Sequence, residues 1–86
     1  MRNICFSPQA WEDFEHWHGQ DKKTLSKILA LIDECARSPF SGTGKPEPLR
    51  HEYQGYWSRR IDHANRMVYK ADADNLHILI LRYHYD

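Results

Sequence analysis

The stretch Leu76-His77-Ile78-Leu79-Ile80-Leu81, close to the end of this 86-residue chain, is a run of Leu and Ile that only His77 interrupts. A short apolar run rich in these residues is typical of a buried strand. We therefore predict a central β-strand at these positions and expect the other segments to be arranged around it.

The tail that follows, Arg82-Tyr83-His84-Tyr85-Asp86, attaches a guanidinium, two phenols and an imidazole directly to this strand. The unperturbed pKa of imidazole lies near neutrality, so histidine is the usual side chain for moving protons. Tyr and His also occur often at the half-buried edges of cores. Two interpretations stay open at this point: a catalytic group, or an aromatic plug over one end of the core.

The first half of the chain predicts one strand and two helices. Residues 2–6 form a strand candidate, and Ser7 is the N-cap of a helix with proline at its first position. Apolar residues at three- and four-residue spacing extend this helix until Gly19. Asp21 caps a second amphipathic helix, which ends before Pro39. A short connection implies an antiparallel helix pair, and its wide apolar faces require a sheet to pack on.

The second half predicts a loop over residues 39–48 and then an antiparallel meander. Its strands are expected at residues 49–53, 56–62, 66–71 and 76–83. A chain of 86 residues suffices for one core, so residues 1–86 are expected to form a single domain.

Composition narrows the function classes. The 12 basic and 12 acidic residues cancel, so the whole molecule exerts no strong attraction on nucleic acid. No apolar run could cross a bilayer and no signal-peptide pattern is present, which favours a cytoplasmic protein. Cys5 and Cys35 fit reduced thiols better than a disulfide, and no group of residues has the spacing of metal ligands. We expect neither a metal nor another cofactor.

Glu47 lies between Pro46 and Pro48. Both prolines restrict the backbone, so the carboxylate is held in a fixed direction, as a general base requires. An incidental glutamate on a rigid surface loop is the alternative. Further along, alternation on the strand from Arg66 places Arg66 on the same face as Val68. An acid, an arginine and the tail imidazole could converge across neighbouring strands, which suits attack of a ribose 2′-hydroxyl on its own phosphate.

The segment from Lys45 to Lys70 contains six basic residues and three acidic residues. Aromatic residues are interleaved with them, and cations beside stacking rings are what single-stranded RNA binding requires. The alternative is the solvated face of an ordinary sheet. The basic residues of this region are Lys45, Arg50, Arg59, Arg60, Arg66 and Lys70.

Four motifs occur here in the order in which YoeB toxins of the RelE/ParE superfamily carry them, and the chain resembles that family over nearly its whole length. The motifs are Lys45-Pro46-Glu47-Pro48-Leu49, Gly55-Tyr56-Trp57-Ser58-Arg59-Arg60-Ile61, Arg66-Met67-Val68-Tyr69 and Arg82-Tyr83-His84-Tyr85. The resemblance implies an α+β, RelE-like fold of the microbial ribonuclease type: two N-terminal helices packed on a twisted, mainly antiparallel sheet. It also implies a bacterial type II toxin that cleaves messenger RNA in the A site of the 70S ribosome and that a YefM-like antitoxin inhibits. It leaves open whether the free toxin is a homodimer.

Carried over by motif, Glu47 matches the general base, Arg66 the phosphate-stabilising arginine, His84 the general acid and Tyr85 a substrate-positioning tyrosine. The expected RNA contacts are Lys45, Arg50, Arg59, Arg60 and Arg82. The chain departs from the family pattern at Ala64-Asn65, where relatives often carry an acidic residue and a histidine, and at Asp86 after the terminal tyrosine.

Two other function classes stay open. One is a non-catalytic RNA- or protein-binding module on the same scaffold, and the other is a gyrase-directed toxin of the ParE branch. The presence of Glu47, Arg66 and His84 together argues against both.

Overall fold

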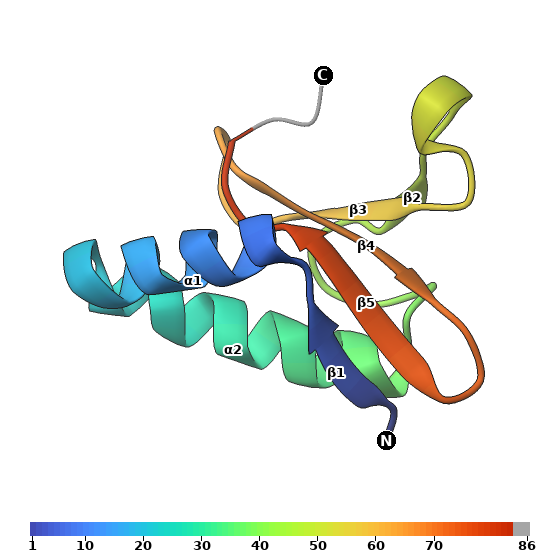
Figure 1. Ribbon diagram of the computed structural model, residues 1–86, viewed down its shortest axis with the longest axis horizontal. Helices are drawn as coiled ribbons and strands as arrows, with labels where there is room; N and C mark the ends of the chain where they lie inside the picture. The colour runs from blue at the N-terminus through green and yellow to red at the C-terminus, as the bar shows by residue number, and fades with distance from the viewer. Residues whose placement is uncertain (84–86) are drawn as a thin grey trace.

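A five-stranded sheet carries two helices on one face in the computed structural model, which describes residues 1–83 (Figure 1). The strands lie in the order β1-β5-β4-β3-β2. In chain order the elements are β1 (Asn3–Phe6), α1 (Pro8–Gln20), α2 (Lys22–Arg37), β2 (Glu47–Pro48), a 3₁₀ turn (His51–Tyr53), β3 (Trp57–Arg60), β4 (Arg66–Ala71) and β5 (Asn75–Ile80).

The strand predicted from the apolar run is confirmed as β5, which has a partner on each side. It pairs in parallel with β1 and antiparallel with β4, and the pairs β4–β3 and β3–β2 are also antiparallel. Parallel neighbours need a long crossover connection. The connection from β1 to β5 contains both helices and the other three strands, and it leaves the first and last strands of the chain side by side in the sheet (Figure 1).

Both predicted helix caps are present. Ser7 Oγ accepts a hydrogen bond from the Ala10 amide at 3.0 Å, and Asp21 Oδ1 accepts one from the Thr24 amide at 3.0 Å. The expected end of α1 at Gly19 is wrong by one residue, because the helix continues to Gln20 and breaks at Asp21, whose φ of −155° is extended. Asp21 therefore ends one helix and caps the next, which fixes the tight α1–α2 connection.

The core fills the space between the helices and one face of the sheet. α1 is fastened to the end of β5 by two side chains one turn apart. Trp17 Nε1 donates to the Leu81 carbonyl at 2.8 Å, and the buried Asp13 carboxylate accepts from the Leu81 amide at 3.0 Å. The fully or nearly fully buried apolar residues of this core are Ala10, Trp17, Ile28, Leu31, Ile32, Cys35, Ala36, Ile61, Met67, Tyr69, Leu76, Ile78 and Leu81.

The meander differs from the expectation in its first strand. Residues 49–53 do not form a strand, because the chain pairs with β3 only at Glu47–Pro48 and then turns. The turn begins at His51, whose φ of 56° lies in the left-handed region and is incompatible with a strand. β3 and β5 also end earlier than predicted, at Arg60 and at Ile80, whereas β4 spans the predicted residues 66–71.

Candidate active site

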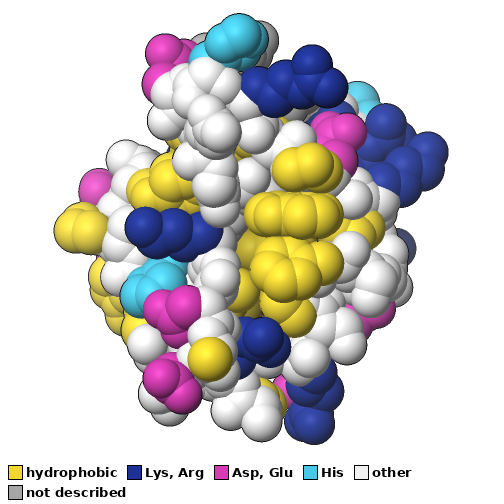
Figure 2. Space-filling model, turned by 90° about the vertical axis from the view of Figure 1, so that its right-hand side faces the viewer, with side chains coloured by type: hydrophobic (Ala, Val, Ile, Leu, Met, Phe, Trp, Pro, Cys, Tyr) yellow, Lys and Arg dark blue, Asp and Glu magenta, His cyan; other side chains and the backbone are white. Residues whose placement is uncertain are grey.

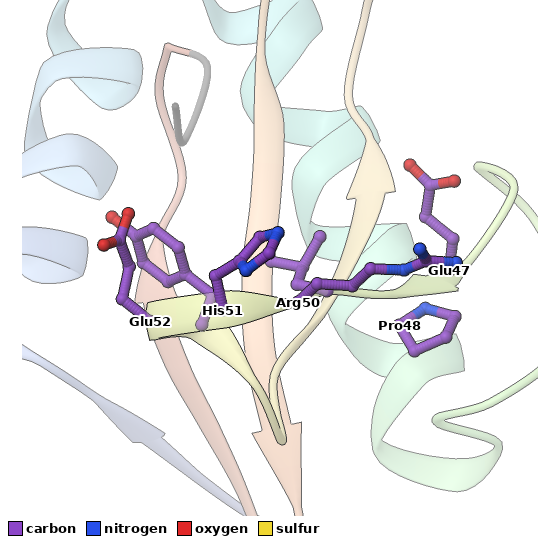
Figure 3. Close-up of a pocket in the computed structure, with 7 residues that line it drawn as sticks. Glu47, Pro48, Arg50, His51 and Glu52 are labelled. Atoms are coloured by element: carbon purple, nitrogen blue, oxygen red, sulfur yellow. The ribbon is translucent and has the colours of Figure 1, made fainter.

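Glu47 lies on β2, one of the two edge strands of the sheet, and its side chain is exposed. Backbone hydrogen bonds to β3 and the residue before it hold the backbone on both sides of Glu47. The Arg60 amide donates to the Gly44 carbonyl at 2.7 Å, and the Leu49 amide donates to the Tyr56 carbonyl at 2.9 Å. Figure 3 shows the Glu47 carboxylate on the side of the strand opposite to the ring of Pro48. The backbone that carries this carboxylate is therefore fixed, as the flanking prolines predicted.

A pocket of about 400 Å³ borders Glu47 and the 3₁₀ turn. In Figure 3 the carboxylates of Glu47 and Glu52 lie at opposite ends of the segment, with Arg50 and His51 between them. His51 and Glu52 have no neighbours in the sequence that distinguish them as site residues. His51, whose backbone is in the left-handed region, lines this pocket.

Arg66 is half-buried at the start of β4, and its guanidinium is tethered to the preceding turn. Nη1 donates to the Asp62 carbonyl at 2.9 Å and to the Asn65 carbonyl at 3.2 Å. Within residues 1–83 no other acceptor is hydrogen-bonded to this planar guanidinium, and its other N–H groups have the geometry to bind a phosphate. The turn thus positions the cation before any substrate binds.

Asp62 and Asn65 organise this turn. Asp62 Oδ1 accepts hydrogen bonds from the amides of Ala64 and Asn65, both at 2.8 Å, and from the Asn65 side-chain amide at 3.1 Å. Partial burial would raise the pKa of the Asp62 carboxyl, but these hydrogen bonds outweigh it and hold the pKa below its ordinary value. Asn65 is thereby a structural residue of the site, although the sequence marked it only as a departure from the family pattern.

The same asparagine connects the turn to the tail. Asn65 Oδ1 accepts a hydrogen bond from the Tyr83 amide at 2.6 Å, and the Tyr83 carbonyl accepts one from the Arg66 amide at 3.0 Å. The last described residue is therefore anchored beside Arg66. The predicted catalytic residues His84 and Tyr85 lie outside the described residues.

Strand register places Glu47 and Arg66 on the same face of the sheet. Glu47 pairs with Ser58, Ser58 pairs with Val68, and Arg66 is two residues from Val68 on β4. The neighbouring β4 residues Met67 and Tyr69 belong to the helix-covered core, so Arg66 and Val68 face away from the helices. We call this side the helix-free face; it carries the side chains of Cys5, Glu47, Ser58, Arg60, Arg66, Val68, Lys70 and His77.

The separation on this face follows from the sheet geometry. Two strand spacings put Glu47 and Arg66 ~10 Å apart across the sheet, and two residues add ~7 Å along it. Both side chains are long, and Arg60, directly opposite Arg66, adds a second cation between them. One phosphate group and its ribose could lie within reach of all three.

Arg59 is not an RNA contact, contrary to the prediction, because its side chain is completely buried on the helix side of β3. Its guanidinium donates to three carbonyls of the loop after α2: Ser38 at 2.5 Å, Ser41 at 2.8 Å and Thr43 at 3.1 Å. The Glu34 carboxylate lies 3.5 Å from Nη1. Arg59 therefore fixes the loop that leads to Glu47.

The other predicted RNA contacts are accessible. Lys45, Arg50 and Arg60 are exposed, and Arg82 is half-buried with its guanidinium carbon 4.4 Å from the centre of the Tyr83 ring. Figure 2 shows Lys and Arg side chains spread around a column of uncovered hydrophobic groups. Cationic and hydrophobic groups are thus intermixed on this side of the molecule.

Residues 1–83 contain no group of three or more His, Cys, Asp or Glu side chains arranged to hold a metal ion. In the same part of the chain, no helix has the length and apolar character needed to span a membrane.

A family model described as a YoeB-like toxin of bacterial type II toxin-antitoxin systems matches residues 6–85. The chain belongs to this family. Toxin RelK of Mycobacterium tuberculosis is 55% identical over 85 residues, which cover 99% of this chain and all of the relative.

Solved YoeB structures share the fold. The structure of the YoeB dimer from Staphylococcus aureus superposes with a TM-score of 0.90 at 44% identity and covers 98% of each chain. A chain of the heterotetrameric YoeB-YefM complex from Staphylococcus aureus gives 0.89 at 43% identity and covers 99% of each chain. The resemblance to YoeB toxins and the predicted α+β architecture are both confirmed.

Proposed function

We propose that this YoeB-family toxin is a ribosome-dependent endoribonuclease that cleaves messenger RNA in the A site and so inhibits translation. The proposal depends above all on one arrangement: Glu47, on a backbone segment held by hydrogen bonds, shares the helix-free face with Arg66, whose guanidinium is already oriented by two carbonyls. An acid and a preorganised cation on one face of a sheet suit attack on a phosphodiester.

In the proposed reaction the Glu47 carboxylate takes the proton of a ribose 2′-hydroxyl. The 2′-oxygen attacks the adjacent phosphorus, and Arg66 stabilises the negative charge that develops on the phosphoryl oxygens. His84 donates a proton to the departing 5′-oxygen, and Tyr85 positions the substrate. The products are a 2′,3′-cyclic phosphate and a 5′-hydroxyl. Every proton is carried by a side chain, so the reaction requires no metal.

RNA affinity in this proposal comes from local cations, because the protein has no net charge. Lys45, Arg50, Arg60 and Arg82 contact phosphates around the scissile bond, and this attraction is salt-sensitive. Such a small patch orients free RNA poorly. The ribosome supplies the orientation by holding the messenger in the A site.

We propose two protein partners by analogy with the relatives. The Staphylococcus aureus complex pairs YoeB with YefM, and another structure from that organism is a YoeB dimer. A YefM-like antitoxin would inhibit this toxin, and the free toxin would form a homodimer.

The decisive experiment incubates EDTA-treated toxin with programmed 70S ribosomes and maps the ends of the cleaved messenger. Glu47→Gln should abolish cleavage while the protein remains folded, and naked transcript should be cut far more slowly than ribosome-bound messenger. The mechanism would be refuted if Glu47→Gln cleaved at the wild-type rate, or if cleavage by the wild-type toxin required added zinc or manganese. Inhibition of DNA gyrase without RNA cleavage would instead place the protein with ParE-type toxins.

A further inference from the structure

A second group of side chains suited to RNA lies on the helix-free face, away from Glu47. Cys5, His77 and Lys70 form one row across β1, β5 and β4, since Cys5 pairs with His77 and His77 pairs with Lys70. Tyr56 lies at the end of this row, where Lys70 Nζ is 5.3 Å from the centre of its ring. These four residues help to line a hollow of about 230 Å³.

The ammonium of Lys70 brings a positive charge to this hollow. Lys70 is exposed, and within residues 1–83 no carboxylate forms an ion pair with it. The nearby carboxylate of Asp72 contacts the imidazole of His77 and not Lys70: the distance from His77 Nε2 to Asp72 Oδ2 is 3.6 Å. An ammonium that lies over the face of a tyrosine ring can still bind a phosphate.

The hollow lies on the same strand as the proposed catalytic arginine. Lys70 is four residues after Arg66 on β4, which corresponds to ~13 Å along the helix-free face. A single-stranded RNA segment of ~4 stacked nucleotides, at ~3.4 Å each, covers that distance. Val68 lies between the two cations on this face and is completely buried, so an RNA chain whose scissile phosphate lies at Arg66 reaches Lys70 by passing over the groups that cover Val68.

We propose that Tyr56 and Lys70, with His77 as the floor of the hollow, form a second subsite for single-stranded RNA. Lys70 pairs with a phosphate and Tyr56 stacks on a base, displacing the ammonium from its ring. The subsite deepens the proposed function and rests on it. An unpaired cation beside an aromatic ring is the combination that binds RNA without regard to sequence.

The first test measures binding without cleavage. A fluorescent 2′-O-methyl oligoribonucleotide lacks the attacking hydroxyl, so its anisotropy reports affinity alone. Lys70→Gln should lower the slope of log affinity against log salt by ~0.7, the share of one phosphate on a single strand. Tyr56→Leu should weaken binding ~10-fold through loss of stacking, whereas Tyr56→Phe keeps the affinity. Lys27→Gln, an exposed lysine of α2, is the matched control and should change neither quantity.

The two cysteines offer an independent footprint. Cys5 is half-buried in the hollow, and Cys35 is fully buried in the core. The oligoribonucleotide should slow alkylation of Cys5 severalfold in the wild type but not in Lys70→Gln, with Cys35 unreactive in all samples.

The ribosomal assay separates this proposal from the catalytic one. In single-turnover cleavage, Lys70→Gln should raise the toxin concentration for half-maximal rate ~5-fold and leave the maximal rate within about twofold. If no variant or wild-type protein cleaves, the proposed function fails, but the binding and footprint results still decide the subsite. The subsite would be overturned if Lys70→Gln and Tyr56→Leu left the RNA affinity and the salt slope unchanged and the oligoribonucleotide did not slow alkylation of Cys5. The subsite would also be overturned if Lys70→Gln and Tyr56→Leu lost binding to a YefM-like antitoxin but kept their RNA affinity. The hollow would then be part of a protein interface.

Discussion

The buried guanidinium of Arg59 and the hydroxyl of Tyr69 form the centre of a clamp on the loop that precedes Glu47. Arg59 Nε donates to the Tyr69 hydroxyl at 3.2 Å, and this hydroxyl donates to the Pro39 carbonyl at 2.6 Å. Burial raises the pKa of Tyr69 far above its ordinary value, so the phenol keeps its proton and remains a donor. Two side chains from adjacent strands thus satisfy the carbonyls of a loop that has no regular structure.

Replacing Arg59 by methionine should destabilise the protein severely. The substitution keeps much of the side-chain volume but leaves the carbonyls of Ser38, Ser41 and Thr43 without their donor. Breaking a buried charge network costs about 3–5 kcal/mol. The free energy of unfolding, measured in urea, should fall by this amount.

The adjacent Arg60 provides the control for that experiment. It is exposed on the other face of the same strand, so Arg60→Met should change the free energy of unfolding by less than ~0.5 kcal/mol. Tyr69→Phe removes only the hydroxyl and should cost about 1–2 kcal/mol. Equal stabilities of Arg59→Met and Arg60→Met would show that the clamp contributes nothing.

His51→Gly should stabilise the protein. His51 has a φ of 56°, a backbone conformation that an L side chain adopts at a cost and that glycine adopts freely. Relief of this strain, reduced by the greater entropy of glycine in the unfolded chain, should add about 0.5 kcal/mol to the free energy of unfolding. Glu52→Gly in the same turn has no positive φ to relieve and should lower stability instead. A destabilised His51→Gly would mean that the imidazole makes a stronger contact than its backbone strain costs.

The turn before Arg66 should loosen in acid. The folded-state pKa of Asp62 is lower than its ordinary value of 3.8, so its stabilising contribution is complete above that pH and is lost as the pH falls through the folded-state pKa. Asp62→Asn should therefore reduce stability at neutral pH and show a flatter decline from about pH 5 to about pH 2. Asp33→Asn, an exposed change on α2, should follow the wild-type acid curve in chemical denaturation. Superimposable curves for wild type and Asp62→Asn would contradict this.

Arg66→Ala should reduce cleavage more than Arg66→Lys does. A guanidinium tethered to the Asp62 carbonyl can still present two N–H groups to a phosphate, whereas an ammonium offers one point of charge. Loss of one preorganised donor typically costs about 10²–10³ in rate. Single-turnover cleavage on programmed ribosomes measures this, with circular dichroism as the check on folding. Small and equal effects of both substitutions would make Arg66 an ordinary surface residue.

Local sequence predicted the elements well wherever a short-range rule decided them. The apolar run gave β5, Ser7 and Asp21 gave the helix starts, and the prolines around Glu47 predicted a rigid backbone that the hydrogen bonds at Gly44 and Leu49 confirm. These features depend on neighbours within a few residues, whose effect on the backbone is the same in any fold.

The sequence alone determined the two helices, the buried strand and the family motifs, because their physical causes are local. Only the tertiary structure decided which of two adjacent arginines is buried. Arg59 and Arg60 have the same chemistry, but alternation along β3 turns one into the core and the other to the helix-free face. The structure likewise gave Asn65 its role, because Tyr83, 18 residues later, returns to donate to its side chain. Contacts between residues so distant in sequence arise only when the sheet closes, since register and packing bring them together.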